Sequence, residues 1–301
     1  MSVYVTLAFT SLALGAVYFL AASGLSLIYG LMDVLNLAHG MFMTIGAYAG
    51  WDLAAHLPTT WPATWIFVIE VAASIVGGAL AAGITEIVLI RPLYGRPLSQ
   101  ILVTIGLDLA VVALLLGGFG SSSLTLPVPL WLIEATRSGT LILPHADFVA
   151  IGAGVGVLVV LEWFLRRTRY GITIRAGVEN REMVRALGID VGRAFTLVFV
   201  IGGAMAGLAG LLYTVVFSGD LVSPLQGDSL LIFALIVVVI GGLGSIRGSA
   251  VAALLVAVVQ DFTNYYLGTH SGLAEIGNLS VVLLLALVLE WRPRGLFGRI
   301  S

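Results

Sequence analysis

The chain has 301 residues, of which 59% are hydrophobic and 10% charged, and its mean hydropathy is +1.10. Soluble domains carry about a quarter charged residues, so this composition excludes a soluble fold and places the chain in a bilayer. The sequence contains no cysteine, and all 14 basic residues are arginine. It therefore lacks a thiolate metal site and the lysine that a P-loop or a Schiff-base enzyme needs. We expect no catalytic site, metal or cofactor on this chain, and no nucleotide hydrolysis on it.

Nine apolar runs are long enough to cross a hydrocarbon core of about 30 Å. They fall near residues 4–31, 37–55, 64–90, 99–118, 147–165, 195–217, 229–243, 249–267 and 276–291. The second and the seventh are the weakest, and either could be a half-helix or a re-entrant segment. The sequence thus predicts an all-α polytopic integral membrane protein. We expect eight or nine transmembrane helices, some of them broken or re-entrant, in a single domain over residues 1–301.

The arginines orient these spans. With nine spans and the N-terminus outside, every arginine except Arg137 falls on one side of the membrane. Positive charge gathers on the cytoplasmic side of membrane proteins. We therefore expect an inner (plasma) membrane protein whose N-terminus is outside and whose C-terminus is cytoplasmic. The connection 119–146 is then a long external loop, which its serines and prolines predict to be irregular.

The longest polar interruption, residues 166–193, lies on the cytoplasmic side in this arrangement. Its seven arginines and three acidic residues give it a net charge of about +4, although the whole chain carries −2. Four of its residues recur at helical spacing: Ala176, Asn180, Met183 and Leu187. Glu182 and Arg185 can pair one turn apart, and Gly188 suits a helix end. The pattern favours a short amphipathic helix whose apolar stripe needs a partner or the membrane surface, and the alternative is a solvated loop.

A helix break is predicted near residues 30–40, where Asp33, Asn36 and His39 follow a long apolar run. Polar groups at membrane depth are costly unless they are buried in protein or line a cavity. These residues could therefore bound a substrate path, or they could brace the broken helix. No metalloprotease or Ser/His/Asp pattern is visible, so a membrane hydrolase has little support.

Asp108 lies near the middle of the fourth span, and Thr104 and Gln100 precede it by one and two turns. A carboxylate in the middle of a membrane span is a functional candidate. It could equally pair with a neighbouring helix or be protonated. Elsewhere, three pairs of glycines are spaced so that helices can approach closely: Gly46 and Gly50, Gly203 and Gly207, Gly244 and Gly248. We expect these pairs to serve packing inside the chain rather than an interface between subunits.

Four stretches occur in a recognisable order: residues 24–48, 91–107, 171–212, and 236–260 together with 291–299. Together they resemble the permease subunits of bacterial ABC importers for branched-chain (hydrophobic) amino acids, in particular the smaller of the two permeases. The chain departs from that family at Arg247, where proline is frequent, and at Asp108, where a small or amide residue is usual. The loop 119–146 also differs. The departures at Asp108 and in the loop affect the expected substrate more than the mechanism.

The resemblance implies that the chain translocates branched-chain or related hydrophobic amino acids inward by alternating access. It implies three kinds of partner: a second homologous permease, two ATP-binding-cassette ATPase subunits, and a periplasmic or extracellular binding protein. The helix at 176–187 would lie in a groove of the ATPase. The candidate coupling residues are Arg175, Glu179, Asn180, Glu182, Met183, Arg185, Leu187 and Gly188. The candidates for the translocation path are Tyr29, Asp33, Asn36, His39, Thr104 and Asp108.

Two alternatives remain open. The same machinery could carry urea, short amides or aromatic acids, because the binding protein does most of the selecting. A secondary transporter without ATPase subunits could use Asp108 as a proton site. The single central carboxylate and the lack of a clear inverted repeat in the sequence speak against it. We expect no nucleic-acid partner.

Overall fold

The computed structural model describes residues 2–32, 35–58, 60–138, 141–172, 191–271 and 276–298 of the chain. Within these ranges it has nine long helices, one for each predicted span. They are α1 (Ser2–Met32), α2 (His39–Ala55), α3 (Ala63–Thr85), α4 (Pro97–Phe119), α6 (His145–Arg167), α9 (Val191–Phe217), α10 (Gln226–Gly241), α11 (Ile246–Ser271) and α12 (Ile276–Trp291). This confirms the predicted all-α membrane fold.

Six of these helices are long and apolar enough to cross a membrane: α1, α3 with its continuation, α4, α6, α9 and α11. The other three have 16 or 17 residues. Two of them, α2 and α10, are the spans that the sequence marks as weakest. They follow breaks in the chain after α1 and α9, so each is a half-helix that begins inside the bundle.

Short elements join the helices at the two ends of the bundle. Helix α3 continues as one π-helical turn, η1 (Glu86–Ile90), and one 3-10 turn, η2 (Arg91–Leu93). The other short elements are β1 (Leu124–Thr125), α5 (Leu130–Ile133), β2 (Ala135–Ser138), β3 (Leu141–Pro144) and β4 (Leu221–Val222). Strand β2 pairs with β3 as an antiparallel hairpin, and β1 pairs with β4. The expectation that the connection 119–146 is irregular is therefore wrong for α5 and the β2–β3 hairpin, where helical and strand hydrogen bonds satisfy the backbone.

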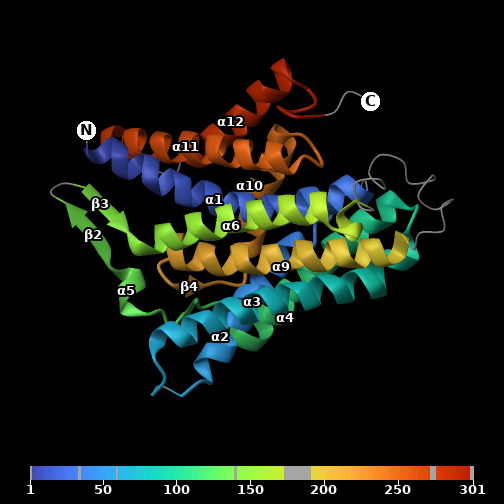
Figure 1. Ribbon diagram of the computed structural model, residues 1–301, viewed down its shortest axis with the longest axis horizontal. Helices are drawn as coiled ribbons and strands as arrows, with labels where there is room; N and C mark the ends of the chain where they lie inside the picture. Colours follow the sequence, from blue (N-terminus) through green and yellow to red (C-terminus); the bar gives the residue numbers. More distant parts are fainter. Residues whose placement is uncertain are drawn as a thin grey trace.

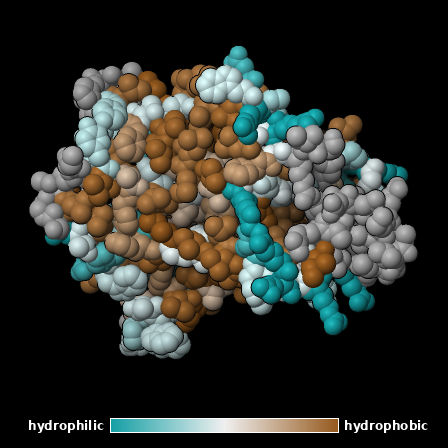
Figure 2. All heavy atoms as spheres, turned by 45° about the horizontal axis from the view of Figure 1, so that its top comes forward, coloured by the Kyte–Doolittle hydropathy of each residue, from teal (hydrophilic) through white to brown (hydrophobic). Residues whose placement is uncertain are grey.

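The two ends of the bundle differ in charge. The start of α1 and the β2–β3 hairpin lie at one end, and η2, the end of α6 and the start of α9 lie at the other (Figure 1). Arg137 is in the hairpin, and the other described arginines lie at the opposite end. Figure 2 shows apolar side chains over the middle of one face, with long hydrophilic side chains gathered toward that second end. We call it the arginine end.

Helices α1 and α9 form the centre of the bundle and are largely buried, whereas α4 and α6 are largely exposed. Glycines allow the central backbones to touch. A Cβ atom on Gly46 of α2 would lie 2.3 Å from the Cα of Gly207 of α9, and one on Gly203 would lie 2.3 Å from the carbonyl oxygen of Gly78. Gly244 likewise meets the backbone of Gly30. The predicted close packing therefore takes place within the chain.

The packing pattern occurs twice, in opposite directions. Helix α1 packs on α9 and α11, and α2 packs on α3 and α9. Correspondingly, α9 packs on α1 and α3, and α10 packs on α11 and α1. Since α1 runs toward the arginine end and α9 runs away from it, α1–α4 and α9–α12 form an inverted repeat (Figure 1). The sequence does not show this repeat, because it is carried by helix order and contacts rather than by identical residues.

Candidate functional site

The break between α1 and α2 is held by an asparagine turn. The side-chain Oδ1 of Asn36 accepts a hydrogen bond from the backbone N–H of Ala38 at 3.2 Å. The backbone carbonyl of Asn36 accepts one from the N–H of His39 at 3.3 Å. Asparagine favours such turns because its side chain can replace a backbone acceptor. Asn36 is buried and directs the chain into α2, whereas Asp33, predicted beside it, lies outside the described residues.

The buried face of helix α4 is polar and lies toward the break between α1 and α2. Its buried residues are Gln100, Thr104, Asp108 and Val112, one per turn, and the rest of the helix is more exposed. Residues four apart lie on one face of a helix, so the three polar side chains share the inward face. Gln100 donates from Nε2 to the carbonyl of Leu93 at 2.8 Å. This arrangement keeps the polar groups of α4 inside the protein and its apolar groups toward lipid.

A small cavity separates the polar face of α4 from the break. It has a volume of about 10 Å³, and its polar lining consists of Asn36, Gln100 and Thr104. The Nδ2 of Asn36 and the Oε1 of Gln100 are buried and have no hydrogen-bond partner. A cavity of this size holds about one water molecule. The structure thus brings together two predicted path residues, Asn36 and Thr104. The residues that carry the unpaired donor and the unpaired acceptor, Asn36 and Gln100, both line this cavity.

Asp108 caps the first turn of α2. Its Oδ1 accepts a hydrogen bond from the backbone N–H of Met41, the third residue of α2, at 3.0 Å. The N-cap residue of α2 is Ala38, which has no side-chain acceptor. The first N–H groups of a helix have no partner within it, and its N-terminus favours negative charge. The side chain of Asp108 on α4 therefore supplies the hydrogen-bond acceptor that the residues at the start of α2 lack.

The start of α10 meets the start of α2 at this point. A Cβ atom on Gly227 would lie 2.1 Å from the carbonyl oxygen of Gly40, so only glycine allows this crossing. The N–H of Gly227 donates to the Oγ1 of Thr44 at 3.1 Å. Two half-helix N-termini, one from each half of the inverted repeat, thus cross in the interior. In membrane transporters such crossings of broken helices are typical places for a substrate or ion site.

Asp228 follows Gly227 and brings a second carboxyl group to the crossing. Its Oδ1 is buried without a hydrogen-bond partner and lies beside Gly40 at the start of α2. The crossing therefore holds two carboxyl groups, those of Asp108 and Asp228, beside two helix N-termini.

Two other predicted path residues lie elsewhere. The ring of His39 is fully buried, and its Nε2 donates to the carbonyl of Ala21 in α1 at 3.1 Å. A carbonyl can only accept, so Nε2 of His39 carries the proton in this bond, and the ring braces α2 against α1. Tyr29 is half-buried near the end of α1.

Sequence reasoning missed Asp228, Gly227 and Thr44. The available signal was a glycine near the start of the second and of the seventh apolar run, in His39-Gly40 and in Gln226-Gly227. An acidic residue follows the second of these glycines. Without knowledge that the two segments cross, neither glycine stands out among 37.

The eight candidate coupling residues between Arg175 and Gly188 lie outside the described residues. The structure does describe the frame beside them, at the arginine end. Glu86 is fully buried and accepts hydrogen bonds from Arg91 at 3.1 Å and from Thr196 at 2.7 Å. The Tyr94 hydroxyl also donates to Glu86. This network ties the end of α3 to the first turns of α9, which follow the coupling segment in the chain.

Comparison with known proteins identifies the family. The model of the family described as "Branched-chain amino acid transport system / permease component" matches residues 7–289. The chain is 29% identical to the high-affinity branched-chain amino acid transport system permease protein LivH of Salmonella typhimurium, over 97% of this chain and 94% of that protein. It is 28% identical to the corresponding permease protein BraD of Pseudomonas aeruginosa, over 96% and 94%. It is also 30% identical to the protein described as probable branched-chain amino acid transport permease protein LivM of Methanocaldococcus jannaschii, over 44% and 40%. Because the family model covers nearly the whole chain, this protein belongs to the family of branched-chain amino acid transport permease components.

Proposed function

We propose that the chain is the permease subunit of an ATP-binding-cassette importer that carries branched-chain or related hydrophobic amino acids inward. The match to the permease family over residues 7–289 carries this proposal. LivH and BraD, similar over almost their whole length, are both named as branched-chain amino acid permeases. On this proposal the whole chain acts as one transmembrane permease domain.

We infer that the importer contains three further kinds of subunit: a second, related permease, two ATPase subunits, and an external binding protein. The similarity to LivM supports a related permease as partner. The absence of lysine from the sequence supports separate ATPases, because a nucleotide-binding loop needs that residue. The predicted helix at 176–187 would then transmit the movement of the ATPases to α6 and α9.

We place the arginine end in the cytoplasm, with the N-terminus outside and the C-terminus inside. The separation of Arg137 from the other described arginines supports this orientation. The ATPase subunits would dock at the arginine end. The β2–β3 hairpin would face the binding protein on the other side of the inner membrane.

We propose that Asn36, Gln100, Thr104 and Asp108 border the translocation path. Helix α4 is the least buried of the apolar spans, so it can move against α2 with little loss of packing. A tilt of α4 would separate Asp108 from Met41 and open the small cavity that Asn36, Gln100 and Thr104 line. During alternating access, the α2–α10 crossing would keep its position, and α4 would move relative to it to open and close the path. His39 would brace the fixed part.

Reconstitution tests this function. Proteoliposomes that contain the chain, its ATPases and its binding protein should take up leucine, isoleucine or valine only when ATP is present. Deletion of residues 176–187 should abolish uptake while the permease still inserts and folds. Uphill uptake by the isolated chain, or normal uptake by the deletion variant, would contradict the proposal. A calorimetric screen of the binding protein against amino acids, urea, short amides and aromatic acids decides the substrate.

A further inference from the structure

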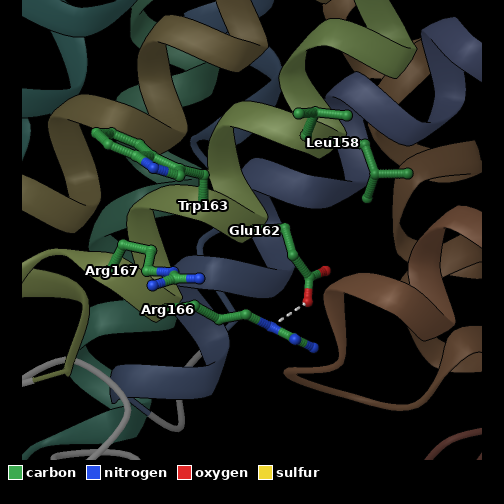
Figure 3. Close-up of a pocket in the computed structure, with 6 residues that line it drawn as sticks. Leu158, Glu162, Trp163, Arg166 and Arg167 are labelled. Carbon is green, nitrogen blue, oxygen red and sulfur yellow. Dashed lines mark ion pairs between the residues drawn. The ribbon is translucent and has the colours of Figure 1, made fainter.

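A hollow lies on the outer face of α6 at the arginine end. It has a volume of about 360 Å³. The described residues that line it are Leu158, Val159, Glu162, Trp163, Arg166 and Arg167 (Figure 3). They form two neighbouring ridges of the helix, each built from residues four apart. The hollow is the groove between these ridges, and each ridge begins with an apolar residue and ends with an arginine.

The length of this groove along α6 is close to the thickness of the hydrocarbon part of one bilayer leaflet. Leu158 and Arg167 are nine positions apart, which corresponds to about 13 Å along a helix. Half of a hydrocarbon core is about 15 Å. Val159 and Trp163 are each 61% exposed, so the groove is open to the surroundings of the bundle. Tryptophan is enriched at membrane interfaces, in agreement with a position between the apolar and the charged part of the groove.

The charged part of the groove is held in place by ion pairs. Glu162 forms an ion pair with Nε of Arg166 at 2.7 Å. It also accepts a hydrogen bond from Nη2 of Arg247, in the first turn of α11, at 2.6 Å. The carboxylate thus holds two guanidinium groups, and Arg167 adds a third on the other flank (Figure 3). Among the described residues no acidic group pairs with Arg167, so this part of the groove carries two uncompensated positive charges.

We propose that this groove is a binding site for an anionic phospholipid of the inner leaflet. The phosphate group would contact Arg166 and Arg167, and one acyl chain would lie along Leu158 and Val159. Basic pockets at the cytoplasmic ends of membrane helices bind anionic headgroups. A flexible arginine would merely extend toward the interface. Here the ion pair with Glu162 holds Arg166 beside the apolar part of the groove. A phospholipid could then place its phosphate at the arginines and an acyl chain along the apolar residues. This proposal rests on the orientation proposed above only for the choice of leaflet.

Native mass spectrometry of the full-length chain in detergent tests the site with two probes, dioleoylphosphatidylglycerol and dioleoylphosphatidylcholine. The double variant Arg166→Gln/Arg167→Gln should bind the anionic lipid about thirtyfold more weakly, and the zwitterionic lipid as before. The matched control is Arg292→Gln/Arg294→Gln, which removes two exposed charges at the same end but outside the groove. Its affinity for the anionic lipid should stay within about threefold of the original.

Several results would overturn the proposal. One is an equal loss of anionic lipid in the control, and another is no preference for the anionic over the zwitterionic lipid. Competition by inorganic phosphate or glycerol phosphate would show a site for a soluble anion instead. Displacement of the bound lipid by added ATPase subunits would show a protein-docking face. None of these outcomes depends on transport, so the lipid site can fail while the proposed importer function holds.

Discussion

The contact between Asp108 and Met41 should stabilise the start of α2 through a hydrogen bond rather than through charge. Two substitutions separate these contributions. Asp108→Ala removes the acceptor from the buried N–H of Met41, and Asp108→Asn retains an oxygen acceptor in the same place.

The expected magnitude follows from the burial of this site. Asp108 is 9% exposed, and α2 has no side-chain cap of its own. A buried donor left without a partner costs about 1–3 kcal/mol, and the loss of a helix cap costs about 1 kcal/mol. These two figures describe the same lost bond, so we expect Asp108→Ala to destabilise the chain by about 1–3 kcal/mol. Asp108→Asn should change the free energy of unfolding by less than about 1 kcal/mol.

Denaturant unfolding of the full-length chain in mixed micelles measures these changes. Hydrogen exchange over residues 39–45 adds a local reading, because the amide of Met41 should lose protection in Asp108→Ala and keep it in Asp108→Asn. The matched control is Leu109→Ala, the next residue of α4, which is 63% exposed and should change neither measurement. Equal destabilisation by both Asp108 variants would refute the reasoning and show that the charge matters. In the reconstituted importer, an altered pH profile of uptake in Asp108→Asn would instead mark a proton site.

Two further predictions concern packing and buried charge. Gly227→Ala should prevent the crossing of α2 and α10 and abolish folded, transport-competent protein, because its Cβ would lie 2.1 Å from a backbone oxygen. Gly106→Ala, with nothing within 4 Å of its Cβ, should have no effect in the same expression and uptake assays. Arg91→Gln leaves the buried Glu86 carboxylate without its ion pair, so it should lower the free energy of unfolding. The double variant Glu86→Gln/Arg91→Gln should recover part of that loss in denaturant titrations, and a double variant less stable than Arg91→Gln would contradict this account.

The sequence alone determined the nine apolar helices, six of them long enough to cross a membrane, and the placement of the arginines along the chain. Each span satisfies its own backbone hydrogen bonds and is recognised by its own apolar length, so no distant residue is needed to predict it. The second and the seventh apolar run are recognised as the weakest candidates for the same reason, because length and hydropathy are read from the run itself. A half-helix of 16 or 17 residues is a local property of the chain.

The tertiary structure decided which polar residues share a site. The bond between Asp108 and Met41 joins residues 67 positions apart, and the contact between Gly40 and Gly227 joins the two halves of the chain. Helical spacing placed Gln100, Thr104 and Asp108 on one face of α4, but it could not show what that face meets. The same limit explains why His39 was grouped with Asp108, although its ring faces α1. Hydropathy depends on neighbouring residues, whereas the partner of a buried polar group depends on how the helices cross.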